Sequence, residues 1–270
     1  MTLISLKSLI VTYMPAPLLN ALKRVHYLRM LKRFTEAEEQ DLTVAKRLVC
    51  SGDCAVDVGA NVGCYTKVLS EVVGPQGLIV SLEPVPETFT ILGYCVKKLR
   101  LTNVQTHNCA ASDKNGTMSM AVPRYEAGGY NYYQARLVVQ GESRSTNQKD
   151  AMRQEYSNIP VRTLDEVLKN INRPLTFIKC DVEGHELAVL LGSRKIIERW
   201  MPAWLIEVSG NPDAKESSAA ALFEFLHKTG YEAWWYTEGR LRRRVSGDIS
   251  VNYFFLRGAH LERVRSMIAS

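Results

Sequence analysis

Short apolar runs alternate with longer amphipathic stretches from Cys50 onward, and this alternation predicts strands connected by helices. Strands are expected at 54–58, 78–82, 103–107, 117–122, 175–180 and 203–208. Helices are expected at about 62–73, 86–99, 186–191 and 215–229, with another opened by a capping box at Thr163. Crossover connections of this length join parallel strands, so the pattern indicates an α/β fold with a mostly parallel sheet.

The last part of the chain departs from this pattern. Tyr231–Tyr236 and Ser250–Leu256 predict two strands, and the stretch between them is too short for a crossover helix. We therefore expect them to pair antiparallel. The stretch between them contains a cluster of arginines, Arg240, Arg242, Arg243 and Arg244. We interpret this cluster as a solvated turn rather than a site for an acidic ligand.

Two segments lack the alternation. Residues 123–158 are polar, rich in tyrosine and without a sustained period, which is typical of a lid or a substrate-binding insertion. Residues 1–49 are expected to form a basic helical arm, and residues 50–270 a single domain. Lys7 and the prolines that follow it interrupt the early apolar run, so we expect no membrane-spanning helix.

The charge is unevenly distributed. The chain carries a net charge of +6, yet residues 1–35 contain six basic side chains and no acid, and the rest has 28 of each sign. A neutral body argues against nucleic acid as a partner. The basic arm leaves two alternatives, a helix packed on the domain or a peripheral membrane contact through residues 1–33. Six cysteines without a C-x-x-C pair favour a reduced, cytoplasmic setting.

The clearest chemical signal is the sequence Asp57-Val-Gly-Ala-Asn-Val-Gly63, which directly follows a predicted strand and opens a helix. Glycine lets the backbone pass close to a ligand, and the first turn of a helix offers free N–H groups. Glu83 stands twenty residues later, at the end of the second strand, where a carboxylate can accept both hydroxyls of a ribose. Asp57 would repel a pyrophosphate but suits a cofactor with an ammonium and a sulfonium. Together these residues predict a nucleoside-cofactor site.

A second group, Asp181-Val-Glu-Gly-His-Glu186, follows the strand at 175–180. Alternation places Asp181 and Glu183 on one side of an extended segment. His185 is a candidate catalytic base, because histidine commonly removes protons near neutral pH, with Asp181 orienting it or acting as the base itself. Two other interpretations stay open: His185 points to solvent beside a turn, or Asp181, Glu183 and His185 bind a metal ion. We predict no metal, because no distant partner ligand stands out.

These motifs resemble the FkbM family of S-adenosylmethionine-dependent methyltransferases over residues 52–256. The matching segments are 57–63, 82–84, 108–113, 163–165, 178–186 and 207–208. The resemblance implies a Rossmann-like class I methyltransferase fold, with a mostly parallel seven-stranded sheet and a C-terminal antiparallel hairpin strand. It also implies S-adenosylmethionine as the cofactor and a hydroxyl of a small molecule or glycan as the methyl acceptor.

Carried over by position, the resemblance also implies which residues bind the cofactor. Those for the methionine end and the ribose would be Asp57, Gly59, Asn61, Gly63 and Glu83. Ser112 and Asp113 would lie along the adenine, where Asp113 would accept its exocyclic amine, although a turn before Lys114 is the alternative for Asp113. Asp181 would line the active site next to the cofactor.

The expected function is therefore S-adenosylmethionine-dependent O-methylation of a small molecule or glycan. Two alternatives from other classes stay open: a nucleic-acid or protein methyltransferase, and a catalytically silent nucleoside-binding interaction module. Release of a labelled methyl group would separate an enzyme from the silent module. Salt-sensitive binding to a polymer would separate a macromolecular substrate from a small one.

Overall fold

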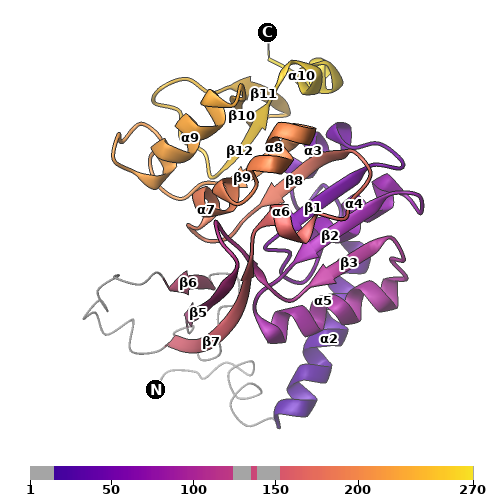
Figure 1. Ribbon diagram of the computed structural model, residues 1–270. Helices are drawn as coiled ribbons and strands as arrows, with labels where there is room; N and C mark the ends of the chain where they lie inside the picture. The colour runs from indigo at the N-terminus through magenta and orange to yellow at the C-terminus, as the bar shows by residue number, and fades with distance from the viewer. Residues whose placement is uncertain (1–14, 124–134, 139–152, 270) are drawn as a thin grey trace, which may run out of the picture.

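The computed structural model describes residues 15–123, 135–138 and 153–269, and its main sheet has eight strands (Figure 1). These are β1 (Cys54–Val58), β2 (Leu78–Leu82), β3 (Val104–His107), β8 (Leu175–Cys180), β9 (Ala203–Glu207), β10 (Glu232–Thr237), β11 (Arg240–Arg243) and β12 (Asn252–Leu256). Their order is β11-β10-β12-β9-β8-β1-β2-β3. Strands β9, β8, β1, β2 and β3 pair in parallel, whereas β12 lies antiparallel between β9 and β10. The mixed α/β sheet and the antiparallel C-terminal pairing are as predicted.

The predicted number of seven strands is wrong by one, because the arginine-rich stretch forms strand β11 instead of a solvated turn. β10 and β11 are joined through Glu238 and Gly239, which have φ values of 50° and 76°. Two consecutive residues with positive φ make the tight turn that matches the twist of a hairpin. Only Leu241 of β11 is buried, and its arginines are exposed. A single buried position gives too weak an alternation to indicate a strand from sequence.

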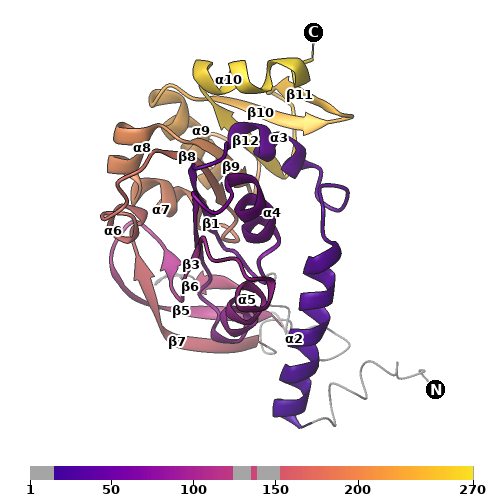
Figure 2. The same ribbon diagram turned by 90° about the vertical axis from the view of Figure 1, so that its right-hand side faces the viewer.

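Helices cover both faces of the main sheet, as Figure 2 shows. One face carries α6 (Leu164–Val167), α7 (Glu186–Leu191), α8 (Arg194–Trp200) and α9 (Ser218–Lys228), and the other carries α3 (Asp41–Leu48), α4 (Cys64–Val73) and α10 (Gly258–Val264). In β1, Val56 and Val58 pack toward the first face and Ala55 toward the second. Burial on both faces explains why the central strands are continuous apolar runs.

A second sheet lies beyond the carboxyl ends of β1, β2 and β8. Its strands, in spatial order, are β4 (Ala110–Ala111), β7 (Arg153–Arg162), β5 (Gly116–Pro123) and β6 (Arg136–Val138). Residues 136–138 and 153–158 are therefore strands, although the sequence between 123 and 158 shows no sustained period. Residues 124–134 and 139–152, where we expect most of the lid, lie outside the described residues, so that expectation stays a prediction.

The predicted N-terminal arm contains two helices with different surroundings. α2 (Ala16–Arg33) lies against α5 (Pro86–Leu99), and its Tyr27 and Leu31 join a small apolar cluster with Ile91. α3 instead contributes to the main core. None of the described helices is long and apolar enough to cross a membrane.

Candidate functional site

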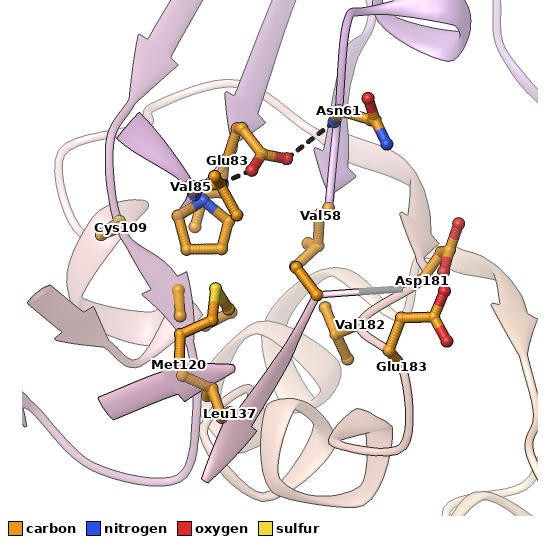
Figure 3. Close-up of a pocket in the computed structure, with 16 residues that line it drawn as sticks. Val58, Asn61, Glu83, Val85, Cys109, Met120, Leu137, Asp181, Val182 and Glu183 are labelled. Carbon is orange, nitrogen blue, oxygen red and sulfur yellow. Dashed lines mark hydrogen bonds between the residues drawn. The ribbon is translucent and has the colours of Figure 1, made fainter. Parts of the chain in front are cut away.

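A pocket opens where β1, β2 and β8 end, between the main sheet and the second sheet (Figure 3). Open α/β sheets bind their ligands at this edge. Polar groups on its wall come from Gly59, Asn61, Glu83, Asp181 and Glu183. Apolar side chains on its wall include Val85, Met120 and Leu137. An apolar surface together with a few hydrogen-bonding groups suits a ligand that has a ring system and several polar substituents.

Glu83 is held firmly at the end of β2. It is 5% exposed, and its carboxylate accepts the N–H of Asn61 at 2.9 Å and the N–H of Val85 at 2.8 Å. Burial raises the pKa of Glu83 to about 7, although the two N–H donors oppose this rise. Each carboxylate oxygen has a second lone pair, so Glu83 can still accept two donors from the pocket.

The loop after β1 bends at Gly59, which has a φ of 76°. The N–H groups of Gly59 and Ala60 both donate to the carbonyl of Leu82, at 3.0 and 2.9 Å. A Cβ atom on Gly59 would collide with the carbonyl oxygen of Asp181. Glycine is therefore required at position 59 because the loop after β1 lies close to the end of β8. Gly59 also lines the pocket.

Lys179 connects two carboxylates next to this loop. It is 8% exposed, and its Nζ lies 3.0 Å from Asp181 Oδ2 and 4.0 Å from Asp57 Oδ1. Burial alone would lower the pKa of Lys179, but Asp181 and Asp57 raise it overall, so the ammonium stays charged. The other oxygen of the fully buried Asp57 accepts the hydroxyl of Thr66 at 2.6 Å. Asp57 Oδ1 has no hydrogen-bond donor among the described residues.

The chain turns sharply after Asp181, because Glu183 and Gly184 have φ values of 54° and 94°. Glu186 accepts the N–H of Gly184 at 2.9 Å and so closes the turn. The turn at Gly184 was one of the interpretations of this sequence, and it is confirmed. A non-glycine residue seldom adopts a positive φ, and here the turn brings Glu183 to the pocket wall.

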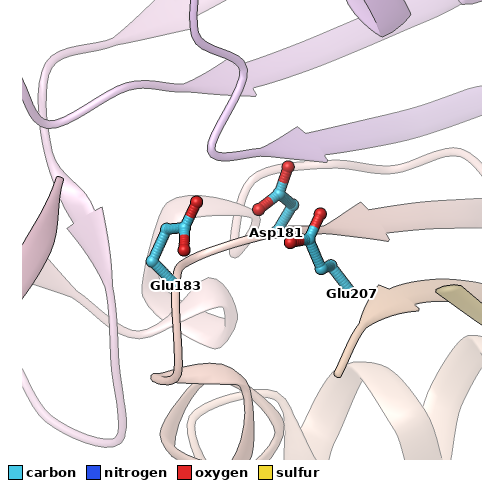
Figure 4. A group of neighbouring side chains, drawn as sticks. All are labelled: Asp181, Glu183 and Glu207. Atoms are coloured by element: carbon cyan, nitrogen blue, oxygen red, sulfur yellow. The ribbon is translucent and has the colours of Figure 1, made fainter. Parts of the chain in front are cut away.

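Three carboxylates converge at the rim of the pocket (Figure 4). One oxygen each from Asp181, Glu183 and Glu207 lies within 4.8 Å of the others. Burial, reinforced by repulsion from neighbouring carboxylates, raises the pKa of Glu183 to about 6 and that of Glu207 to about 7. Such a group can accept a proton or attract a cation. It differs from the metal-binding set considered from the sequence, which contained His185 instead of Glu207.

His185 is hydrogen-bonded to a different segment. Its Nε2 lies 2.8 Å from Ser112 Oγ, and the Ser112 hydroxyl donates to Asp113 Oδ1 at 2.9 Å. Because Ser112 has one proton to donate, Nε2 must carry the proton that Ser112 accepts. Burial lowers the pKa of His185, although Asp113 opposes this, so the neutral ring is favoured. His185 does not simply point to solvent; it supports the segment predicted to lie along adenine.

The structure brings only part of the predicted set to the pocket wall. The predicted residues that line the pocket are Gly59, Asn61, Glu83 and Asp181. Those that do not line it are Asp57, Gly63, Ser112, Asp113 and His185. Lys179 and Glu207 are site residues that were not predicted from the sequence. Each is a charge within or at the end of a buried strand, where a charge requires a partner, and that signal could have identified both.

The fold and the pocket define an α/β protein with a candidate ligand site at the carboxyl end of a mixed sheet. The family model described as "Methyltransferase FkbM domain" matches residues 57–233, more than half of the chain. The chain belongs to the FkbM methyltransferase family. The resemblance noted from the sequence motifs is thereby confirmed.

Individual relatives are distant. "Methyltransferase 1" from Beauveria bassiana (strain ARSEF 2860) is 27% identical over 143 residues, which are 51% of this chain and 57% of that protein. The methyltransferase FkbM structure from Methylobacillus flagellatus KT has a TM-score of 0.46 and 19% identity, covering 77% of this chain and 45% of that chain. Aeropyrum pernix fibrillarin, solved with natively bound S-adenosyl-L-methionine, has a TM-score of 0.44 and 12% identity, covering 80% of this chain and 73% of that chain. The chain thus spans about half the length of the first two.

Proposed function

We propose that the protein transfers a methyl group from S-adenosylmethionine to a hydroxyl of a small molecule or glycan. The observation that carries this proposal is Glu83, a buried carboxylate fixed at the end of β2 with lone pairs free toward the pocket. Its position suits the two adjacent hydroxyls of a ribose. The family supports methyl transfer, and the buried acid supports an adenosine-bearing donor.

The residues present fit this cofactor. Glu83 would bind the ribose, and the loop with Gly59 and Asn61 would contact the methionine end. Asp57 is fully buried and already paired with Lys179, so it would act on the cofactor only through the loop that follows it. Ala111, which immediately precedes the predicted adenine residues Ser112 and Asp113, lines the pocket, and this supports adenine binding nearby. When bound, S-adenosylmethionine supplies an electrophilic methyl group on a positively charged sulfur.

The carboxylate cluster supplies the proton acceptor that a hydroxyl substrate needs. Asp181 is already engaged in an ion pair with Lys179 at 3.0 Å. Glu207 has a pKa of about 7, close to the optimum for a general base at neutral pH. We infer that Glu207 accepts the hydroxyl proton, while Asp181 and Glu183 hold the acceptor at the rim. That Asp181 or His185 acts as the base remains an alternative prediction.

The proposal is tested with cofactor labelled in its methyl group. The protein is incubated with labelled S-adenosylmethionine and fractionated metabolite and glycan extracts, and then with RNA and with protein. We expect label in a small molecule or glycan, as an ether stable to mild alkali. Label confined to RNA or protein would establish the macromolecular alternative. Tight binding of cofactor with no transfer to any fraction would establish the silent module.

The affinity for adenosine is expected to rise with pH. The carboxyl of Glu83 has a pKa of about 7 in the free protein, and only its ionised form accepts two ribose hydroxyls. Binding therefore releases a proton, and affinity should rise about tenfold per unit from pH 5 to pH 7 before levelling off. Adenosine is used because it lacks a titrating amino-acid group. Titration calorimetry in buffers with different ionisation enthalpies measures the number of protons released on binding. A constant affinity between pH 5 and pH 7 would contradict the expectation.

Replacing His185 by alanine is expected to reduce cofactor affinity more than turnover. The change removes the hydrogen bond that steadies Ser112 and, through it, Asp113. A hydrogen bond of this kind contributes about 1 kcal/mol, so the dissociation constant of S-adenosylhomocysteine should rise roughly fivefold. Turnover at saturating cofactor should fall less than about tenfold. A loss of roughly 10²-fold or more with unchanged affinity would instead identify His185 as the base.

A further inference from the structure

The exposed side of helix α2 carries a stripe of large apolar side chains. Leu18, Leu22 and Val25 are 52%, 46% and 39% exposed. At 100° per residue they share one face of the helix, whereas Leu31, 1% exposed against the domain, lies on nearly the opposite face. Figures 1 and 2 both show the N-terminal end of α2 extending past the rest of the described chain. The first half of α2 therefore presents apolar groups to solvent, and the second half buries others.

The two apolar stripes on opposite faces explain why the sequence of α2 shows no amphipathic pattern. A single contact surface would gather apolar residues on one side along the whole helix. Here one surface is needed for α5, through Tyr27 and Leu31, and the other is exposed and packs against no other part of the chain that the structure describes. The uncovered stripe is not required for packing on the domain.

The face of the exposed stripe changes from apolar to basic along the helix axis. Arg29 and Lys32 continue the line of Leu18, Leu22 and Val25 and are exposed. Arg29 lies about 6 Å along the axis beyond Val25. No acidic residue occurs in the first 35 residues of the chain.

A change of polarity along a helix axis matches the depth profile of a bilayer. The acyl region gives way to a layer of phosphates over a distance similar to one or two helical turns. The N-terminal half of the exposed face of α2 is apolar and the C-terminal half is basic. This order suits insertion of the N-terminal end at the boundary between acyl chains and headgroups. The sequence of the fifteen residues before α2 contains nine apolar residues and a single charged one, Lys7. A helix-binding groove on a protein would instead require one apolar face along the whole helix.

We propose that α2 docks the protein on an anionic phospholipid bilayer. Leu18, Leu22 and Val25 insert at the boundary between headgroups and acyl chains, and Arg29 and Lys32 lie at the level of the phosphates. No residue of α2 lines the pocket, so the docking surface is separate from the candidate active site. The proposal is independent of the methyl-transfer chemistry, because it depends on the surface of α2 alone.

The test is flotation of the full chain with vesicles of phosphatidylcholine containing 30% phosphatidylserine, against vesicles of phosphatidylcholine alone. We expect the wild type to bind the anionic vesicles at least about tenfold more tightly, and the difference to shrink as salt is raised. The triple variant L18S/L22S/V25S should lose at least about tenfold in binding to anionic vesicles. The double variant R29Q/K32Q should lose about 30-fold at low salt, because each cation near the surface contributes about fivefold.

The matched control variants remove exposed apolar or basic side chains outside α2. V245S/I249S/V251S removes three apolar side chains that are 62%, 73% and 60% exposed, and K114Q/K215Q removes two exposed lysines. Both should bind vesicles within about threefold of the wild type, since charges beyond a Debye length are screened. All variants should keep the wild-type unfolding temperature to within a few degrees.

Three results would overturn the proposal. The first is equal binding of the wild type to neutral and anionic vesicles, or to neither. The second is an equal loss in the control variants. The third is a wild-type dimer in sedimentation that L18S/L22S/V25S converts to a monomer without a change in vesicle binding, which would make the stripe a contact between copies of this chain.

Discussion

Replacing Glu83 by alanine is expected to weaken binding of S-adenosylmethionine and S-adenosylhomocysteine alike, by roughly 30- to 1,000-fold. On the proposed function the carboxylate accepts two ribose hydroxyls, and hydrogen bonds to a charged acceptor contribute about 1.5–3 kcal/mol each. Water entering the gap recovers part of this, which leaves a loss of about 2–4 kcal/mol. The loss should be equal for both ligands because they share the ribose. Titration calorimetry of both ligands measures it.

Glu83 also accepts the N–H groups of Asn61 and Val85, so its removal can loosen the loop as well as the ribose contact. Comparing adenosine with 2′,3′-dideoxyadenosine separates the two effects. The wild type should strongly prefer adenosine, and the alanine variant should not distinguish the two ligands. Glu198→Ala, at an exposed glutamate on α8, is the matched control and should behave as the wild type. Unchanged affinity in Glu83→Ala would contradict the cofactor assignment.

Replacing Glu207 by glutamine is expected to slow methyl transfer by roughly 10²- to 10⁴-fold at saturating cofactor. Glutamine keeps the shape of the side chain but cannot take a proton from the acceptor hydroxyl. The pKa of about 7 means that the basic form of Glu207 accumulates as pH rises through 7. The wild-type rate should therefore climb over pH 6–8, and the variant should lose this rise. Single-turnover rates with the acceptor found in the labelled-methyl screen provide the measurement.

The control for Glu207 is Glu216→Gln, an exposed glutamate outside the carboxylate cluster, which should keep the wild-type rate and pH profile. The affinity for S-adenosylhomocysteine should be unchanged in Glu207→Gln, because Glu207 does not line the cofactor pocket. If Glu207→Gln kept both the rate and its pH dependence, the proton would have to go to Asp181, Glu183 or His185.

The elements that were predicted well have local signals. Strands β1, β2, β8 and β9 are largely apolar runs because helices cover both of their faces. Gly59 bends the loop between β1 and α4, and Glu83 follows the next strand, so their proximity follows from the parallel pairing of β1 with β2. The position of a site residue can be predicted from sequence where it depends only on the residue's own strand and on the neighbouring strand.

The features that were missed depend on distant segments. His185 bonds to Ser112, 73 residues away, so neither its partner nor its tautomer is visible in the local pattern. Glu207 ends a buried strand, which marks it as a charge that needs a partner, but the partner Asp181 is set by the pairing of β9 with β8 and is not visible in the segment around Glu207. Strand β6 has a single buried side chain, Leu137, which is too little for a period to be recognised.

The ion pair of Lys179 with Asp57 helps to fix the pairing register of β8 against β1. The two residues are directly opposite each other in the ladder between β1 and β8. If β8 slipped by one residue, Lys179 would move to the opposite face, among the apolar side chains that pack under α7 and α9. An ammonium left there without a carboxylate costs several kcal/mol. Misaligned sheets are thereby rejected during folding, before any ligand binds.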